Sequence, residues 1–215
     1  MRESDLITIE HFLENKEEML DVREEPFEKL MFFYKSALNQ LITQMNIIKD
    51  EFQIMYNYDL IDHIDTRIKE PKSIVKKMEK KKYDKTYLNL IEKINDIAGM
   101  RIVCTLKDDI FFIRDLIKQM PELHILKEKD YVTNPKPSGY SSYHMIVEVP
   151  VKLTQKTIYV KCEIQIRTLA MDFWASFEHK VKYKTKNDVN PKMSKELVSC
   201  AKMINKFDTK MINYK

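Results

Sequence analysis

The sequence is poor in glycine. Gly99 and Gly139 are its only two glycines in 215 residues, whereas glycine makes up about 7% of an average protein. Walker-type loops and dinucleotide-binding turns need several closely spaced glycines, because only then can backbone N–H groups surround a phosphate. The sequence therefore excludes both motifs, and a nucleotide bound to this chain must have its phosphates held by side chains and metal.

Long apolar runs and paired cysteines are also missing. No apolar segment approaches the length of a membrane span, and residues 1–7 carry too many charges for a signal peptide. The three cysteines, Cys104, Cys162 and Cys200, are scattered, which favours free thiols over disulfides or metal ligands. We therefore expect a cytoplasmic protein that does not contact a membrane.

The charge balance is nearly even. The 37 basic and 33 acidic residues give a formal net charge of +4, which suits anionic small molecules and is too small to indicate nucleic-acid binding by itself. Apolar residues make up 44% of the chain and charged residues 33%, as in globular proteins. At this length we expect one domain with helical extensions.

Two long helices are predicted near the ends of the chain. The apolar residues of 27–55 follow a 4-3-4-3 spacing, and 193–211 repeats this pattern. A heptad pattern does not identify the partner helix, so packing within the subunit and packing against another subunit both stay open. Before them, the acidic N-terminal segment is expected to hold a short helix over residues 9–20. This gives three segments: residues 1–25, a domain over 26–190 that includes the long helix, and a C-terminal helix over 191–215.

An α/β body is predicted between these helices. We expect helices over residues 73–82, 87–94, 108–120 and 168–183, and strands over 100–104, 123–131, 142–151 and 157–167. In the last of these helices, Leu169, Phe173, Phe177 and Val181 lie on one stripe. Helices flanking a mostly antiparallel, mixed sheet make an α+β domain.

The expected strand 157–167 separates two kinds of side chain. Its apolar positions are Ile158, Val160, Cys162, Ile164 and Ile166, and its polar positions are Tyr159, Lys161, Glu163, Gln165 and Arg167. Because successive side chains of a strand point to opposite faces, one face is apolar and the other polar. An acid placed beside glutamine and arginine is not required on an ordinary solvated face. It is required on a face that holds a metal and a polyphosphate.

Two acids are candidate metal ligands. Asp96 precedes Gly99 and the strand that carries Arg101, and Glu163 lies on the polar face of its own strand. If these strands are neighbours, the two carboxylates can share one Mg²⁺, which usually takes one or two carboxylates plus substrate phosphates. A solvated acid is the simpler interpretation of Asp96, whereas Glu163 is better placed because Lys161 flanks it.

Cations gather before the helix expected at residue 73. Arg67 and Lys69 lie in a predicted turn, and Ser73 is a plausible capping residue for the helix, whose N-terminus attracts phosphate. Residues 80–82 are lysines that we assign to a solvated helix face.

The segment 136–144 reads as a stiffened loop that presents an aromatic ring. Prolines lie on both sides of Lys136, and Gly139 permits a positive φ next to Tyr140. A tyrosine fixed in this way can stack on a base, an interaction worth about 1–3 kcal/mol, while Lys136 and His144 can reach phosphate. A hairpin loop with a packed tyrosine and a structural histidine is the alternative.

These segments, in this order, resemble the RelA/SpoT-type GTP pyrophosphokinases, the alarmone synthetases. The resemblance is carried by residues 163–180 (EIQIRTLAMDFWASFEHK), by 96–101 (DIAGMR), and by 136–140 (KPSGY) with His144. It covers roughly residues 30–185. The long N-terminal helix and the short chain are similar to the small, stand-alone synthetases, especially the RelP type.

The resemblance implies transfer of pyrophosphate from ATP to the 3′-hydroxyl of GTP or GDP, which yields pppGpp or ppGpp and AMP in the stringent response. It also implies a nucleotidyltransferase-like sheet, a Mg²⁺ cofactor and a homotetramer. The preference between GTP and GDP and activation by product stay open. Long family members carry a hydrolase domain built on a His-Asp pair, and since this sequence has no His-Asp dipeptide, we expect it to make alarmone without degrading it.

By motif, each candidate residue receives a role. Five are implied to bind ATP: Arg67 and Arg101 around the adenine, and Lys69, Ser73 and Lys77 near the phosphates. Five are implied to bind the acceptor: Tyr140 on guanine, Lys136 and His144 on the 5′-phosphates, and Gln165 and Arg167 as the adjoining wall. Asp96 and Glu163 would hold Mg²⁺, and Glu163 would also accept the proton of the attacking hydroxyl.

The sequence departs from the family pattern in two places, and three alternative functions stay open. Ser141 stands where many relatives have arginine, and residues 1–25 match no segment of the family. The rivals are another Mg²⁺-dependent nucleotidyltransferase, which would release pyrophosphate, an RNA-binding module built on residues 76–85, and a regulator that binds alarmone without making it.

Overall fold

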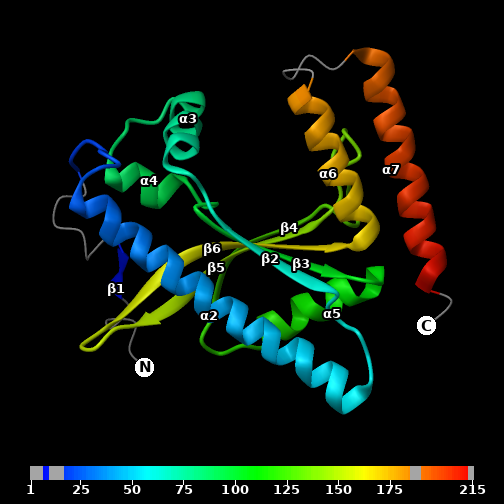
Figure 1. The fold of residues 1–215 in the computed structure, drawn as a ribbon, viewed down its shortest axis with the longest axis horizontal. Coiled ribbons are helices and arrows are strands. Elements are labelled where there is room, and N and C mark those ends of the chain that lie inside the picture. Colours follow the sequence, from blue (N-terminus) through cyan, green and yellow to red (C-terminus); the bar gives the residue numbers. More distant parts are fainter. Residues whose placement is uncertain (1–6, 10–16, 185–189, 213–215) are drawn as a thin grey trace.

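The computed structural model describes residues 7–9, 17–184 and 190–212. A twisted central sheet carries helices on both faces, and a pair of helices projects from one of its ends (Figure 1). The strands are β1 (Ile7–Thr8), β2 (His63–Ile68), β3 (Ala98–Cys104), β4 (His124–Asp130), β5 (Tyr143–Lys152) and β6 (Thr157–Thr168). The helices are α2 (Glu25–Tyr56), α3 (Pro71–Lys81), α4 (Tyr87–Lys93), α5 (Lys107–Lys118), α6 (Leu169–Lys184) and α7 (Pro191–Met211). None of the described helices is long and apolar enough to cross a membrane.

The sheet is mixed and mostly antiparallel, as predicted. Its strand order is β2-β3-β6-β5-β4, and the short β1 pairs with the start of β6. The β3–β6 and β1–β6 pairs are parallel, and the β2–β3, β4–β5 and β5–β6 pairs are antiparallel. The α+β class is confirmed, and the expected strands are found within two residues of their predicted ends.

Strand β2 is the main error in the predicted elements. Arg67 was expected in a turn, but it lies in β2, which pairs with β3. The strand forms an edge of the sheet, and three consecutive residues, 65–67, are exposed. An edge strand that buries so little has no apolar alternation for the sequence to reveal.

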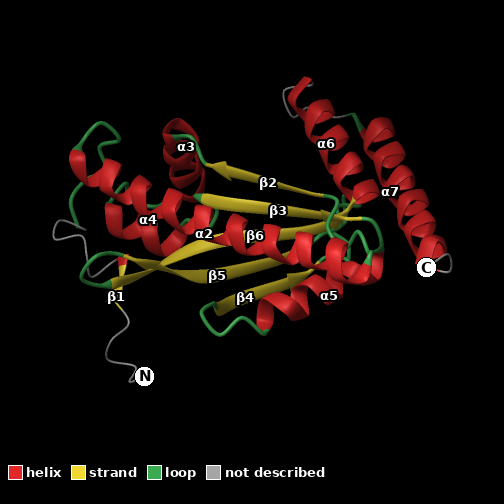
Figure 2. Cartoon of the chain, turned by 60° about the horizontal axis from the view of Figure 1, so that its bottom comes forward, coloured by secondary structure: helices red, strands yellow, loops and turns green. Residues whose placement is uncertain are grey.

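The long helix α2 covers the apolar face of the sheet. It packs across β2, β3, β5 and β6, and it lies with α5 along one side of the sheet (Figure 2). Seven positions of the predicted stripe are buried: Phe27, Met31, Tyr34, Leu38, Leu41, Met45 and Ile48. Burying a large apolar side chain stabilises a fold by about 1.5–3 kcal/mol. The stripe of α2 therefore serves the chain's own core as far as Ile48, whereas Met55 is 73% exposed.

The predicted stripes of α6 and α7 form only part of the contact between these helices. Trp174 and Ala175 of α6 lie against Leu197 and Ala201 of α7. Val181 of the α6 stripe and Ile204 of the α7 stripe pack against this contact, whereas Phe173 of α6 and Phe207 of α7 are exposed. A tryptophan set against alanine allows close helix contact, and this complementarity of size is invisible to a hydrophobic pattern.

The N-terminal segment contributes to the sheet and the core. Of the helix predicted over 9–20, residues 10–16 lie outside the described residues, and residues 17–20 form a turn and an isolated bridge rather than a helix. Strand β1 lies beside β6, and Ile9 is buried.

Candidate active site

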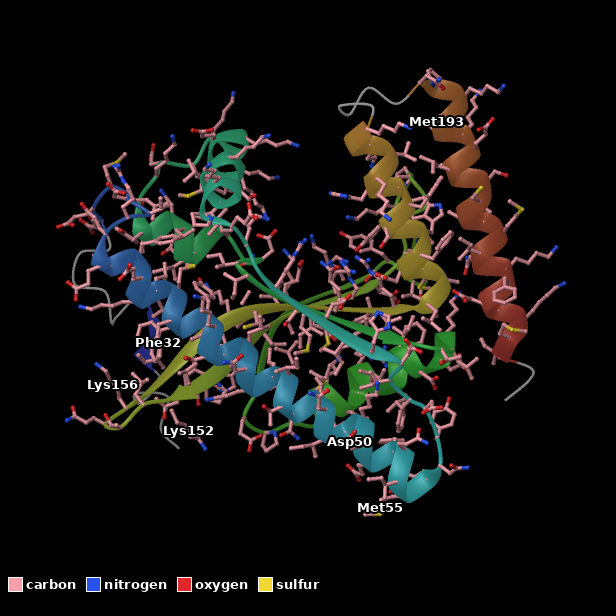
Figure 3. The ribbon with its side chains drawn as sticks, in the orientation of Figure 1. Phe32, Asp50, Met55, Lys152, Lys156 and Met193 are labelled. Atoms are coloured by element: carbon pink, nitrogen blue, oxygen red, sulfur yellow. The ribbon has the colours of Figure 1, made fainter. Side chains whose placement is uncertain are left out.

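The strand register brings the candidate residues together on the face of the sheet opposite α2. One row of paired positions crosses five strands: Asp65, Arg101, Gln165, His144 and Lys129. A second row contains Arg67, Gly99 and Glu163. Polar side chains crowd over the middle of the sheet between α3 and α6 (Figure 3). Residues from segments far apart in the sequence thus share one surface.

A hollow of about 190 Å³ lies at the β2–β3 end of this surface. Its walls include Arg67, Arg101, Glu163 and Gln165, and Gly99 lies between them. A Cβ at Gly99 would meet the Arg67 side chain at 3.7 Å, so the missing side chain keeps this space open. Two guanidinium groups beside such a hollow are suited to a planar aromatic group, which arginine stacks against well.

Asp96 lies at the entrance of β3 between two lysines. Its carboxylate forms ion pairs with Lys69 at 2.9 Å and with Lys77 at 2.7 Å. Burial raises the pKa of Asp96, but the ammonium groups of Lys77 and Lys69 outweigh burial and leave the pKa below its usual value. Asp96 is therefore an ionised, half-buried carboxylate rather than a solvated one.

Glu163 lies in the middle of β6 and is held by two neighbours. Gln165 donates a hydrogen bond to Glu163 at 2.7 Å, and His144 Nδ1 lies 3.4 Å from the other carboxylate oxygen. Burial raises the pKa of Glu163, yet His144 and Gln165 together hold it below its usual value. The charge of Asp96 acts on Glu163 in the opposite direction, so the two carboxylates are close enough to interact.

The two carboxylates fit a divalent cation. Both are ionised, and Mg²⁺ usually takes one or two protein carboxylates, with substrate phosphates and water completing its shell. The described residues contain no cluster of three or more His, Cys, Asp or Glu side chains that could hold a metal ion unaided. Asp96 and Glu163 therefore suit a metal that arrives with a phosphate ligand.

Ser73 does not cap α3 as predicted. The N-cap is Glu70, Pro71 begins the helix, and the backbone N–H of Ser73 donates to the carbonyl of Glu70. Proline is favoured at the first helical position because its missing N–H has no partner there anyway. Ser73 lies in the first turn, close in sequence to the Lys77 that contacts Asp96.

Tyr140 anchors a hydrogen-bonded network at the other end of the surface. Its hydroxyl lies 2.8 Å from His144 Nε2 and accepts a hydrogen bond from Arg167 at 2.6 Å. Arg167 also donates to Gln165 at 2.5 Å. Lys136 holds its ammonium over the Tyr140 ring, 4.6 Å from the centroid. The predicted acceptor residues thus form one connected group that reaches Glu163 through His144.

The loop of residues 131–142 presents Tyr140 in a fixed conformation. Lys136 donates its N–H to the Tyr140 carbonyl, and Gly139 donates to the Lys136 carbonyl. Gly139 has a φ of 90°, and a Cβ there would lie 2.4 Å from the Cβ of Ala201. Glycine is required at this position both by the backbone conformation and by the contact with α7.

Two polar residues beside the candidate site were not among those predicted from the sequence. Asp172, in the first turn of α6, accepts from Arg101 at 3.2 Å and from Arg167 at 3.1 Å through one carboxylate oxygen. Lys129 pairs with His144 in the register of β4 and β5. Asp172 lies inside the motif 163–180, which was the available signal, whereas Lys129 lies in a Lys/Glu-rich strand without one.

Comparisons with known proteins identify the family of this chain. The model of the “Region found in RelA / SpoT proteins” matches residues 66–188. The GTP pyrophosphokinase YwaC of Bacillus subtilis is 44% identical over 191 residues, 89% of this chain and 91% of that protein. The GTP pyrophosphokinase YjbM of the same organism is 31% identical over 185 residues, 86% of each protein.

Solved structures show the same architecture. Small alarmone synthetase 2 from Bacillus subtilis has a TM-score of 0.80 at 43% identity, covering 89% of this chain and 98% of that one. Small alarmone synthetase 1 from the same organism, bound to its product pppGpp, has a TM-score of 0.81 at 30% identity, with coverage of 89% and 97%. The chain therefore belongs to the RelA/SpoT family and has the fold of its small alarmone synthetases.

Proposed function

We propose that this chain is a GTP pyrophosphokinase that transfers pyrophosphate from ATP to the 3′-hydroxyl of GTP or GDP. The family and the relatives named GTP pyrophosphokinases support this activity. The observation that carries it is the place of Glu163: it lines the hollow beside Arg67 and contacts the network that contains Tyr140. One ionised carboxylate thus lies between a donor region and an acceptor region.

ATP is assigned to the β2–β3 end of the surface. Arg67 and Arg101 flank the hollow there and stack on adenine. Lys69 and Lys77 bind the phosphates, with Ser73 beside them in the first turn of α3. Both lysines contact Asp96 in this structure, so an arriving triphosphate meets cations that are already positioned and desolvated.

Mg²⁺ is assigned to Asp96 and Glu163. When bound, the metal neutralises charge that develops on the transferred phosphates and aligns them with the acceptor. Positioning and charge stabilisation are the main requirements of phosphoryl-type transfer. The clustered cations of this site contribute to the positioning and to the charge stabilisation as well.

The reaction needs a base for the acceptor hydroxyl. The 3′-oxygen attacks the β-phosphorus of ATP, the bond from that phosphorus to the oxygen bridging to the α-phosphate breaks, and AMP leaves. The proton of the hydroxyl passes to Glu163, which His144 and Gln165 hold in place. A positioned general base typically adds about 10²–10⁴-fold to the rate.

The acceptor nucleotide is assigned to the Tyr140 network. Lys136 and Arg167 both lie over the Tyr140 ring, with 4.6 and 5.1 Å to its centroid. Guanine replaces one of these cations on the ring, and the displaced cation becomes available to the phosphates. Lys136 and His144 then bind the 5′-phosphates, Lys129 extends this positive wall, and Gln165 and Arg167 complete it.

Self-association is proposed as well. Exposed apolar residues lie on α2 and α6. Phe32 and Met55 of α2, labelled in Figure 3, are 54% and 73% exposed, and Phe173 of α6 is 70% exposed. Exposed apolar surface of this extent favours contact with another copy. We expect a homotetramer in the cytoplasm that lacks hydrolase activity.

Nucleotide analysis tests the function. Purified chain incubated with ATP, GTP and Mg²⁺ should form AMP and pppGpp in equal amounts, and Glu163→Gln should abolish both. The matched control is Glu148→Gln on the neighbouring strand β5, which should keep activity. Release of pyrophosphate without AMP would instead identify another nucleotidyltransferase, and nucleotide binding without turnover would identify a regulator.

A further inference from the structure

A second pocket, of about 390 Å³, opens between α6, α7 and the 131–142 loop. Its walls are mostly apolar and include Pro137 of the loop, Met171 and Trp174 of α6, and Val198 of α7. Small-molecule sites have volumes of about 300–1,000 Å³ and are lined mainly by such side chains with a few polar groups. The pocket has the size and the lining of a ligand site.

This pocket is separate from the hollow assigned to ATP, since no residue lines both. It lies instead against the loop that carries Tyr140. Lys136 and Gly139 line it, and Gly139 is the point where the loop rests on Ala201 of α7. A molecule in the pocket therefore presses on the loop from the side of α7, while the Tyr140 ring belongs to the network around His144.

The polar groups of the pocket favour an anion. Lys202 of α7 lines it, is exposed, and forms no ion pair with the described residues. The hydroxyl oxygen of Ser141 is buried and has no hydrogen-bond partner within the described chain. Among the described residues, no aspartate or glutamate lines the pocket. A buried hydroxyl without a partner is uncommon in folded proteins and is costly unless a ligand or water satisfies it.

We propose that this pocket binds a small amphiphilic anion. Its apolar body lies against Trp174 and Val198, and its acidic group meets Lys202. Occupation fills the space beside the loop and stabilises the conformation that holds Tyr140. This second step rests on the proposed function, because it assumes that Tyr140 binds the acceptor.

Such coupling is reciprocal. A ligand that stabilises the loop conformation seen here tightens binding of the acceptor nucleotide, and the acceptor tightens binding of the ligand by the same factor. ATP, which is assigned to the far end of the sheet, is left unaffected.

The test uses 8-anilinonaphthalene-1-sulfonate (ANS) as the probe, since it joins an aromatic body to one anionic group. Full-length protein is titrated with ANS, followed by ANS emission and by energy transfer from Trp174, the only tryptophan. We expect one saturable site whose affinity falls about tenfold in Lys202→Glu, which reverses the charge, and in Val198→Phe, which fills the pocket. Lys206→Glu makes the same charge change on α7 outside the pocket lining and should bind ANS like the wild type.

GDP completes the test. We expect GDP to tighten ANS binding and ATP to leave it unchanged. Displacement of ANS by GDP would show that the pocket is part of the acceptor site and overturn the proposal, as would wild-type ANS affinity in Lys202→Glu. An ANS affinity that GDP leaves unchanged would refute the coupling.

The outcome is independent of the proposed activity. AMP formation measured without ANS tests the synthetase, and both pocket variants should keep it. A chain that makes no AMP yet binds ANS in a Lys202-dependent way would refute the enzyme assignment and support the pocket. If thermal unfolding shows that Val198→Phe is misfolded, Lys202→Glu at the exposed rim decides alone.

Discussion

Replacing Gly139 by alanine tests whether the 131–142 loop depends on a glycine-sized contact with α7. Gly139 has a φ of 90°, and a side chain in left-handed backbone costs about 1–2 kcal/mol. The added methyl would lie 2.4 Å from the Cβ of Ala201. Since that Cβ is fixed to the helix backbone and cannot rotate away, the loop or α7 has to move, and overpacking of this kind costs about 1–3 kcal/mol.

We therefore expect Gly139→Ala to lower the free energy of unfolding by about 3 kcal/mol. Ala201→Gly alone should cost about 1 kcal/mol, the helix propensity of alanine over glycine. In the double variant the methyl collision is gone while the backbone strain remains. Its loss should be smaller than the sum of the single losses by about 1–3 kcal/mol, as for residues in direct contact.

Urea unfolding of the four proteins measures this cycle, and GDP binding to each measures its effect on the site. We expect GDP affinity to fall in Gly139→Ala, to recover partly in the double variant, and ATP affinity to stay constant throughout. Additive losses would refute the contact between the loop and α7. A fully stable Gly139→Ala would refute the strain as well.

Three further predictions follow from other charged and apolar groups. Asp172→Asn removes the charge that two guanidinium groups share, so it should lower the free energy of unfolding by about 1.5–3 kcal/mol. Asp65→Asn at the exposed edge should cost less than about 0.5 kcal/mol. Equal losses in thermal unfolding would contradict the shared carboxylate. Burial raises the pKa of Asp208 in the folded state above its usual 3.8. Between 3.8 and the pKa of the folded state, the folded state binds more protons than the unfolded state, so the free energy of unfolding falls as the pH rises. Asp208→Asn should therefore be more stable than the wild type at pH 7 and lose this advantage as the pH approaches 3.8, and thermal unfolding across that range would contradict the sign if the difference grew instead. Phe173→Glu should shift the chain to a smaller species in light scattering, while Leu126→Glu on the exposed face of β4 should not; an unchanged mass would exclude the α6 stripe from the subunit contact.

Local pattern predicted the elements of this fold better than their contacts. The alternation of β6 predicted both its strand and its polar face, because a period of two needs no information about neighbours. The heptad spacing of α2 likewise predicted a buried stripe. Strand β2 escaped prediction because an edge strand buries little. Phe173 of the α6 stripe faces solvent because the helix pair is centred on Trp174, Leu197 and two alanines.

The site followed the same division. Motif residues such as Asp96 and Glu163 could be chosen from their types and neighbours, but their proximity depends on the parallel pairing of β3 with β6, which is a long-range event. Asp172 joins the candidate site only because α6 begins directly after β6 and its first turn lies beside Arg101 and Arg167. The spacing of residues along the sequence gives no sign of which arginines it will meet.

Under the proposed function, the charge arrangement lets a chain with two glycines bind polyphosphates through side chains. Each cluster of cations already has its own anion: the lysines at Asp96 and the arginines at Asp172. Desolvating these groups is therefore compensated during folding. Under the proposed function, substrate binding exchanges one anion for another at positioned cations. A phosphate that enters such a site needs little reorganisation, which is the condition under which electrostatic stabilisation is most effective. A glycine-rich loop reaches the same end with backbone N–H groups, and the side-chain solution used here adds carboxylates that are then available to a metal ion.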